Sequence, residues 1–270
     1  MKIILFLFLS ISINYFSFCQ NLTFKKLNDF PILVEEVWAV DGIGNVIVSN
    51  RDQLKKYSPD GKVLFEQSQK SFGRLDKIES MNTLKFVAFS SQQQTLCFFD
   101  NSLTVMEDCL ELADYTILNA TKFATSGQSD KMWVFDQVNS TLSLLSLSGL
   151  NQSQQISNLM GILNVEYITQ MAEIENKLFF VDSTSGVFVL DVYGTLIHKI
   201  DIVGAKWIQF KDGNVLILKN DSLIIYNLRT TKQEIIQLPR DNYSEFLYNG
   251  KSIFFRFSTS IEKFEFLLQN

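Results

Sequence analysis

The segment Lys177-Leu178-Phe179-Phe180-Val181-Asp182 decides the fold, because a short apolar strand of this kind recurs along the chain. A repeat of about 40 residues that contains only strands and turns is typical of a β-propeller, in which each repeat forms one four-stranded blade. We therefore predict an all-β fold, a single six-bladed β-propeller. The other five copies of the strand are residues 45–48, 85–89, 131–136, 214–218 and 252–256.

The last repeat is incomplete, because residues 244–268 supply only three strands before the chain ends. A candidate for the fourth strand lies at the other end of the sequence, in Leu22-Thr23-Phe24-Lys25-Lys26-Leu27, with apolar residues at positions 22, 24 and 27. We predict that this N-terminal strand is the outer strand of the last blade. Such pairing closes the ring and removes an open sheet edge.

Residues 1–19 are predicted to be a secretory signal peptide. Lys2 supplies a positive charge, residues 3–9 are continuously apolar, and Ser17 and Cys19 are small residues at positions −3 and −1 of a cut before Gln20. Two alternatives stay open: a membrane anchor, for which the apolar run is short, and a lipoprotein with Cys19 as its lipidated first residue. Residues 20–270 then form the single propeller domain.

The charge of the chain argues against a nucleic-acid partner. Removal of residues 1–19 leaves 23 basic and 29 acidic residues, a net charge of −6, and no basic block is present. No later segment has the length and hydrophobicity of a transmembrane span. An exported chain of this kind is expected in the periplasm, peripherally associated with the outer membrane.

Two cysteines, Cys97 and Cys109, remain after export. An oxidising compartment permits a disulfide between them. A turn near residues 101–102 would place Cys97 opposite position 106, so direct pairing requires a bulge or a shifted turn. The sequence leaves open whether they are bonded or are two small buried residues.

Each repeat ends with an outer strand. In the second repeat we predict the outer strand at residues 103–106, and in the third at residues 154–159. The stretch of Gln and Ser at residues 151–155 is interpreted as a turn within a blade.

Motifs for catalysis are absent from the sequence. There is no Gly-rich phosphate loop, no nucleophile elbow and no calcium loop, and the only histidine, His198, is expected to be a partly exposed strand residue. The chain is therefore predicted not to be an enzyme, with no catalytic, cofactor-binding or metal-binding residue assigned. The alternative is a ligand-binding or hydrolytic propeller that holds a divalent metal with the polar residues of its inner strands, Glu36, Glu79, Gln170, Gln209 and Glu245.

A third function class is a carbohydrate-binding module, which would use exposed tryptophans. Trp38, Trp133 and Trp207 each lie in a strand of alternating apolar residues. We expect them to be buried between blades rather than to form a sugar platform.

Residues 44–64 resemble an NHL-type propeller repeat. A wider set, residues 72–78, 98–103, 132–137 and 186–195, is similar to a family of exported propeller proteins in bacteria that use type IX secretion. The similarity departs at residues 80–84, where an Asn-Pro pair is expected. The resemblance implies a non-catalytic, protein-binding propeller that plugs the periplasmic mouth of a type IX translocon pore, a large outer-membrane β-barrel. It assigns no binding residues.

Overall fold

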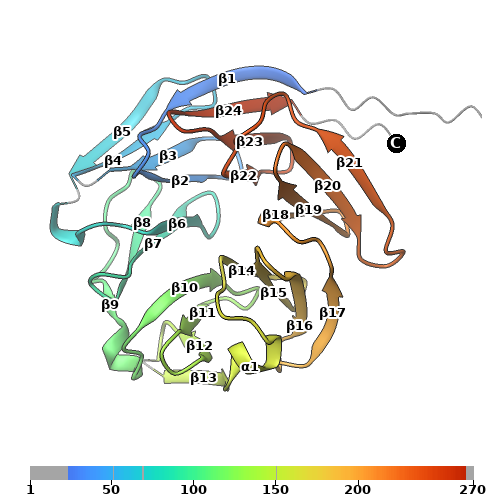
Figure 1. Ribbon diagram of the computed structural model, residues 1–270. Helices are drawn as coiled ribbons and strands as arrows, with labels where there is room; N and C mark the ends of the chain where they lie inside the picture. Colours follow the sequence, from blue (N-terminus) through green and yellow to red (C-terminus); the bar gives the residue numbers. More distant parts are fainter. Residues whose placement is uncertain (1–23, 51, 69, 150, 266–270) are drawn as a thin grey trace, which may run out of the picture.

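Six four-stranded antiparallel sheets form a ring in the computed structural model, which describes residues 24–50, 52–68, 70–149 and 151–265 (Figure 1). The predicted all-β, six-bladed propeller is confirmed. The predicted signal peptide lies outside the described residues. Within the part of the chain that is described, no helix is long and apolar enough to span a membrane.

The blades follow one another along the chain, and their strands run in order from the axis to the rim. The strands are, in blade 1, β2 (Val37–Val40), β3 (Val46–Ser49), β4 (Gln53–Tyr57) and β5 (Val63–Ser68); in blade 2, β6 (Lys77–Ser80), β7 (Lys85–Ser90), β8 (Thr95–Asp100) and β9 (Leu110–Glu111); in blade 3, β10 (Ala120–Thr125), β11 (Lys131–Asp136), β12 (Thr141–Ser146) and β13 (Asn151–Ile156); in blade 4, β14 (Gln170–Ile174), β15 (Lys177–Asp182), β16 (Gly186–Asp191) and β17 (Leu196–Ile200); in blade 5, β18 (Ala205–Lys211), β19 (Asn214–Lys219), β20 (Ser222–Asn227) and β21 (Gln233–Gln237); and in blade 6, β22 (Glu245–Tyr248), β23 (Ser252–Arg256) and β24 (Ser260–Glu265).

The fourth strand of blade 6 is β1 (Lys25–Pro31), which pairs antiparallel with β24 and closes the ring as predicted. The strand lies further along the chain than expected. A register shift lies between Lys26 and Asn28, and Leu27, one of the apolar residues that marked the predicted strand, is exposed. Phe30 is the buried side chain instead, and it packs near Tyr57 and Phe254.

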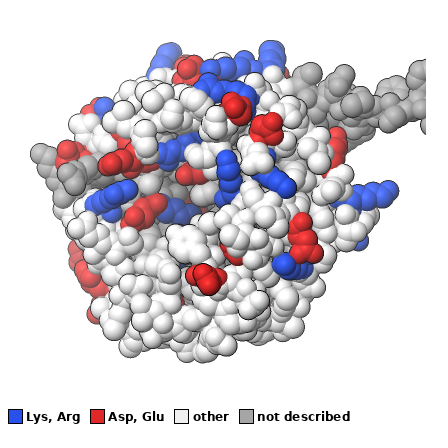
Figure 2. Space-filling model, in the orientation of Figure 1, with Lys and Arg blue, Asp and Glu red and all other residues white. Residues whose placement is uncertain are grey.

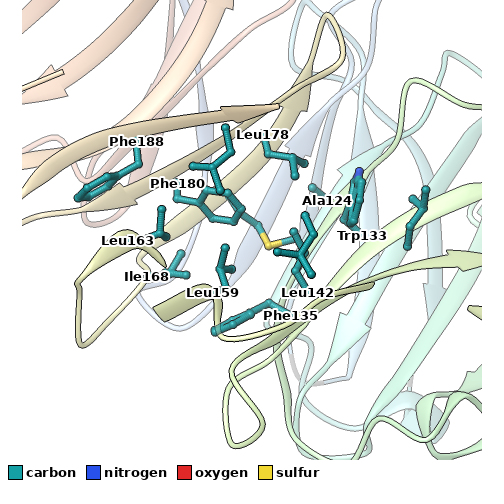
Figure 3. Close-up of a cluster of buried hydrophobic side chains, with 14 residues drawn as sticks. Ala124, Trp133, Phe135, Leu142, Leu159, Leu163, Ile168, Leu178, Phe180 and Phe188 are labelled. Atoms are coloured by element: carbon teal, nitrogen blue, oxygen red, sulfur yellow. The ribbon is translucent and has the colours of Figure 1, made fainter. Parts of the chain in front are cut away.

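The core lies between adjacent blades rather than in one centre. The second strands, such as β15, are buried over nearly their whole length because a neighbouring sheet covers each face. Figure 3 shows one such interface, in which Trp133 and Phe135 of blade 3 face Leu178 and Phe180 of blade 4. This arrangement explains why the second strands carry the clearest apolar signal in the sequence.

The outer strand of blade 3 corrects two predictions. Residues 151–156 form β13 and not a turn, and the chain then continues into a short helix, α1 (Leu159–Leu163), where the end of the outer strand was expected. A rim strand has one solvated face, so Asn151 to Gln155 suit it although they lack apolar character. Leu159 and Leu163 are four residues apart, and the helix buries both of them against blades 3 and 4.

Blade 2 has the shortest outer strand, and the predicted strand at residues 103–106 was wrong. Val105 bridges Phe99 next to the turn, but the ladder resumes only at Leu110, which pairs with Leu96. The extra residues between these pairs move Cys109 opposite Cys97, and the two form a disulfide. The register expected from a turn at residues 101–102 was therefore wrong, because the bulge that the bond requires is present.

The loops divide into two faces. The first strand of each blade starts from a loop that crosses over from the preceding blade, so these loops share one side of the ring, which we call the crossover face. It comprises residues 32–36, 70–76, 112–119, 157–169, 201–204 and 238–244, together with the turns between second and third strands. The opposite side, the hairpin face, carries the turns between first and second strands and between third and fourth strands.

Candidate functional site

The axial channel is a hollow that is lined by residues of all six blades. The first strands β2, β6, β10, β14, β18 and β22 surround a cavity of about 440 Å³. Figure 2 shows acidic and basic side chains together around this central hollow. Four of the five predicted channel residues, Glu79, Gln170, Gln209 and Glu245, line it.

Glu36 was placed in the channel wrongly. It lies in the crossover loop before β2, where it is buried and accepts a hydrogen bond from the Leu33 N–H at 2.5 Å. It stabilises the loop that joins β1 to blade 1. The strand begins one residue later than the sequence pattern indicated, so the side chain belongs to the loop.

The channel carboxylates are each engaged by groups of the protein. Glu79 pairs with the Lys77 ammonium at 2.8 Å and accepts a hydrogen bond from the Thr125 hydroxyl of blade 3, also at 2.8 Å. Glu245 accepts a hydrogen bond from the Trp38 indole N–H of blade 1 at 2.7 Å and lies 3.8 Å from Arg256. These contacts join neighbouring blades and neutralise the carboxylates locally.

Gln170 has a similar joining role. Its side chain donates to the Ile208 carbonyl at 3.0 Å and accepts from the Ile208 N–H at 2.7 Å, so it binds both backbone groups of a residue in blade 5. Both ends of the amide are therefore used within the protein. Gln209 lines the channel without such a double contact among the hydrogen bonds between described residues.

A divalent metal does not fit this set of residues. Oxygen ligands for calcium must converge on one point, whereas Glu79 and Glu245 belong to blades 2 and 6 and each has its own cation. Within residues 24–265, apart from the few positions that are not described, no group of three or more His, Cys, Asp or Glu residues could hold a metal ion.

The channel is also lined by basic side chains that were not predicted from the sequence. Lys77 and Lys122 line it from blades 2 and 3, and Arg256 lines it from blade 6. Burial, and then the neighbouring Lys77 ammonium, lower the pKa of Lys122, and the opposing effect of Asp76 is smaller. The available signal was a lysine in the middle of an inner strand whose other residues are small or apolar, Ala120-Thr121-Lys122-Phe123-Ala124.

The tryptophans do not form a carbohydrate platform. Trp38 and Trp133 are buried, as expected, and their indole N–H groups donate to Glu245 and Glu173 of the neighbouring blades. Trp207 differs from the expectation, because it is half-buried and lines the channel, where its buried N–H has no hydrogen-bond acceptor among the described residues.

His198 lies on β17 and is half-buried, in agreement with the expectation of a partly exposed strand residue. Its Nε2 atom is 2.8 Å from the Tyr226 hydroxyl of blade 5. This contact joins the outer strand of blade 4 to β20, the third strand of blade 5, and it lies outside the channel.

Comparison with known proteins identifies the fold and nothing finer. The sequence matches no protein-family model and no curated protein. The structure is similar to virginiamycin B lyase from Staphylococcus aureus, with a TM-score of 0.61 and 11% identity over 91% of this chain and 100% of that chain. It is also similar to the WD40 domain of Neurospora crassa Pan2, with a TM-score of 0.57 and 10% identity over 84% and 73% of the two chains. At these identities the similarity concerns the six-bladed propeller alone.

Proposed function

We propose that the protein is a non-catalytic, protein-binding propeller of the periplasm that associates with an outer-membrane complex. More specifically, the ring binds at the periplasmic mouth of a type IX translocon pore and plugs it. The sequence resemblance suggests that role, and the crossover face carries the observation that supports protein binding.

That observation is a set of large apolar side chains exposed on the crossover face. Val138 and Leu118 are 76% and 73% exposed, and Val34 and Leu33 are 71% and 64% exposed. Soluble monomers rarely expose such side chains in groups unless the surface binds something. The other exposed apolar residues on this face are Ile162, Tyr167 and Val203.

Leu118 and Val138 lie on neighbouring loops of blade 3. The Gln137 N–H donates to the Asn119 carbonyl at 3.0 Å, which holds the two loops together. The Leu159 N–H at the start of α1 donates to the Ser140 carbonyl at 2.8 Å, so the turn that carries Val138 is also joined to α1. Backbone hydrogen bonds therefore hold three loops of the crossover face next to one another.

Leu33 and Val34 form a second anchor next to a hollow. A depression of about 310 Å³ lies beside them, with Arg74 and Leu75 of the next crossover loop in its wall. Glu35 and Glu36 also line this hollow. Pockets of this kind receive partner side chains at interfaces, and arginine is enriched among the residues that contribute most binding energy.

The residues of the channel and the tryptophans weigh against the two alternative functions. Glu79 and Glu245 are occupied in holding blades together, so the hydrolytic alternative lacks free carboxylates at a common point. No observation favours the carbohydrate-binding alternative, because two of the three tryptophans are buried.

The test is affinity capture of the tagged, exported protein from detergent-solubilised native envelopes, followed by mass spectrometry. We expect stoichiometric recovery of a very large outer-membrane β-barrel. The double variant Leu118→Glu with Val138→Glu should lose it. The matched control is Ile43→Glu with Leu84→Glu on the hairpin face, two side chains of similar exposure that lie in adjacent turns.

Equal loss in both double variants would show that the crossover face is not the binding surface. Recovery of the wild-type protein alone would contradict the whole proposal. Thermal unfolding of all three proteins should be the same, because every substituted side chain is exposed.

A further inference from the structure

The crossover end of the channel contains a cation that the fold does not explain. The Lys122 side chain extends from β10 into the channel, and its ammonium lies 5.6 Å from the ring centre of Tyr167 in the crossover loop before β14. Among the described residues, no carboxylate lies within ion-pair distance of this ammonium. Lys77 and Arg256, the other channel cations, each have a carboxylate partner.

Lys77 lies on the neighbouring inner strand and is close enough to Lys122 to influence its ionisation. The Lys77 ammonium has three N–H donors. Two of them are accounted for by Glu79 at 2.8 Å and the Phe123 carbonyl at 3.0 Å. The ammonium also lies 4.5 Å from the centre of the Phe123 ring, and its third N–H donor has no hydrogen-bond acceptor among the described residues.

The acidic groups nearby do not cancel this charge. Glu79 is paired with Lys77 and bonded to Thr125. Asp76 is exposed at the mouth of the channel, and its carboxylate accepts from the Ser91 N–H at 2.6 Å. Its effect on the pKa of Lys122 is smaller than that of Lys77, so the ammonium experiences net repulsion in addition to desolvation.

We propose that the crossover end of the axial channel binds a small anion of the carboxylate or phosphate class, held by Lys122 and Lys77. The anion would supply the counter-charge that Lys122 lacks and the acceptor for the remaining Lys77 donor. The cavity of about 440 Å³ is within the size range of small-ligand sites. A lysine acts as a point charge rather than a planar fork, so these residues select for negative charge and do not distinguish the two chemistries. The observations that carry this proposal do not include the protein partner proposed above.

A partly desolvated cation without a negatively charged partner reduces the stability of the folded chain. Replacement by an apolar side chain of similar length should therefore raise Tm when no anion is bound. The test compares wild type, Lys122→Met and the control Lys206→Met, in which an exposed lysine on the inner strand of blade 5 is removed. Lys206 does not line the channel.

Each protein is unfolded thermally in a buffer without carboxylate or phosphate, and then with sodium phosphate, sodium malonate or sodium chloride at matched ionic strength. At ten times its dissociation constant, the bound anion should raise the Tm of wild type and Lys206→Met by about 3–6 °C. Lys122→Met should start higher and show no such rise. The anion that produces the rise identifies the chemical class.

A second measurement follows the rate at which an N-hydroxysuccinimide ester acetylates individual lysines, read by peptide mass spectrometry. Under the same conditions the anion should slow acetylation of Lys122 by about tenfold and leave Lys206 unchanged. Equal Tm values in phosphate, malonate and chloride would overturn the proposal. So would an anion-dependent rise that persists in Lys122→Met, or acetylation of Lys122 at an unchanged rate.

Discussion

Blades 6 and 2 both lack an ordinary outer strand, and they compensate in different ways. Blade 6 takes its outer strand from the other end of the chain, so Lys25 pairs with Glu265 across almost the whole sequence. Blade 2 has only the two-residue β9, and a disulfide between residues 12 positions apart holds the connection in place. The first solution depends on a long, non-covalent ladder and the second on a short covalent link.

The difference shows what each blade must resist. In blade 6 the paired strands β1 and β24 come from opposite ends of the chain, whereas the strands of every other blade follow one another in sequence. Loss of β1 therefore exposes a sheet edge and opens the ring. Blade 2 lies inside the continuous chain, and the loss of its link loosens one rim segment. We therefore expect disruption at blade 6 to cost more stability than disruption at blade 2.

The largest effect is expected for Phe30→Ala on β1. Phe30 is fully buried between blades 6 and 1, and removal of a buried phenyl group typically costs about 3–5 kcal/mol. Chemical denaturation should show this loss in a cooperative transition. Leu27→Ala on the same strand is the control and should change stability by less than about 0.5 kcal/mol, because Leu27 is exposed. Equal effects of the two substitutions would contradict the observed register of β1.

Cys97→Ser with Cys109→Ser should have the next largest effect. Without the bond the unfolded chain gains the entropy of an open loop of this length, which removes about 3 kcal/mol of stability on the chain-entropy account. Dithiothreitol should lower the free energy of unfolding of the wild-type protein by the same amount, and with it the Tm, and should leave the double variant unchanged. A wild-type Tm that is insensitive to dithiothreitol would show that the two cysteines are not bonded in the folded protein.

Glu262→Gln tests the charged contacts of β24, the strand that pairs with β1. Burial would raise the pKa of Glu262, but the hydrogen bond from Tyr243 and the cations Lys26 and Arg240 outweigh it and hold that pKa below its usual range. Because the folded-state pKa is lowered, the stabilisation is complete above the unfolded pKa near 4.5 and is lost as the pH falls through the folded value. We expect Glu262→Gln to lower the free energy of unfolding by about 2 kcal/mol at pH 7, and this difference from wild type should disappear at low pH. A cost independent of pH would contradict this assignment.

The smallest effect is expected for Gln94→Ala, which loosens blade 2 from blade 3. The Gln94 side chain accepts from the Ala120 N–H at 2.7 Å and donates to the Ala120 carbonyl at 3.0 Å. It also donates to the Ser91 carbonyl within its own turn at 2.7 Å. Loss of these bonds should cost about 1–2 kcal/mol in urea denaturation. Gln93→Ala, a neighbour in the same turn, is the control and should have little effect. If Gln94→Ala lowered the free energy of unfolding as much as Phe30→Ala, it would contradict the expectation that disruption at blade 6 costs more stability than disruption at blade 2.

Much of the architecture could be predicted because its signals are local. Each second strand, such as Lys177 to Asp182, is apolar throughout since two sheets cover it, and six such strands define six blades. The outer strands could not be predicted with the same accuracy. Asn151 to Gln155 form a strand without an apolar pattern, because a rim strand needs hydrogen bonds from its neighbour more than it needs buried side chains.

The candidate site was predictable only in part, for a related reason. Inner-strand position was enough to place Glu79 and Gln170 in the channel, but it did not show that Glu79 is neutralised by Lys77 and bonded to Thr125, 46 residues later. Such contacts link positions about one repeat apart, and the loop lengths between blades vary. Small changes in those lengths decide which side chains meet.

The sequence by itself determined that this chain is a six-bladed propeller closed by its own N-terminal strand, because the spacing of apolar strands is a property of neighbouring residues. Only the tertiary structure decided that Cys97 meets Cys109, that Glu36 leaves the channel, and that Lys122 enters it. These outcomes depend on register shifts at Cys109 and Lys122 and on the residue at which β2 begins. Such features move a side chain to another partner without changing the pattern of residues along the chain.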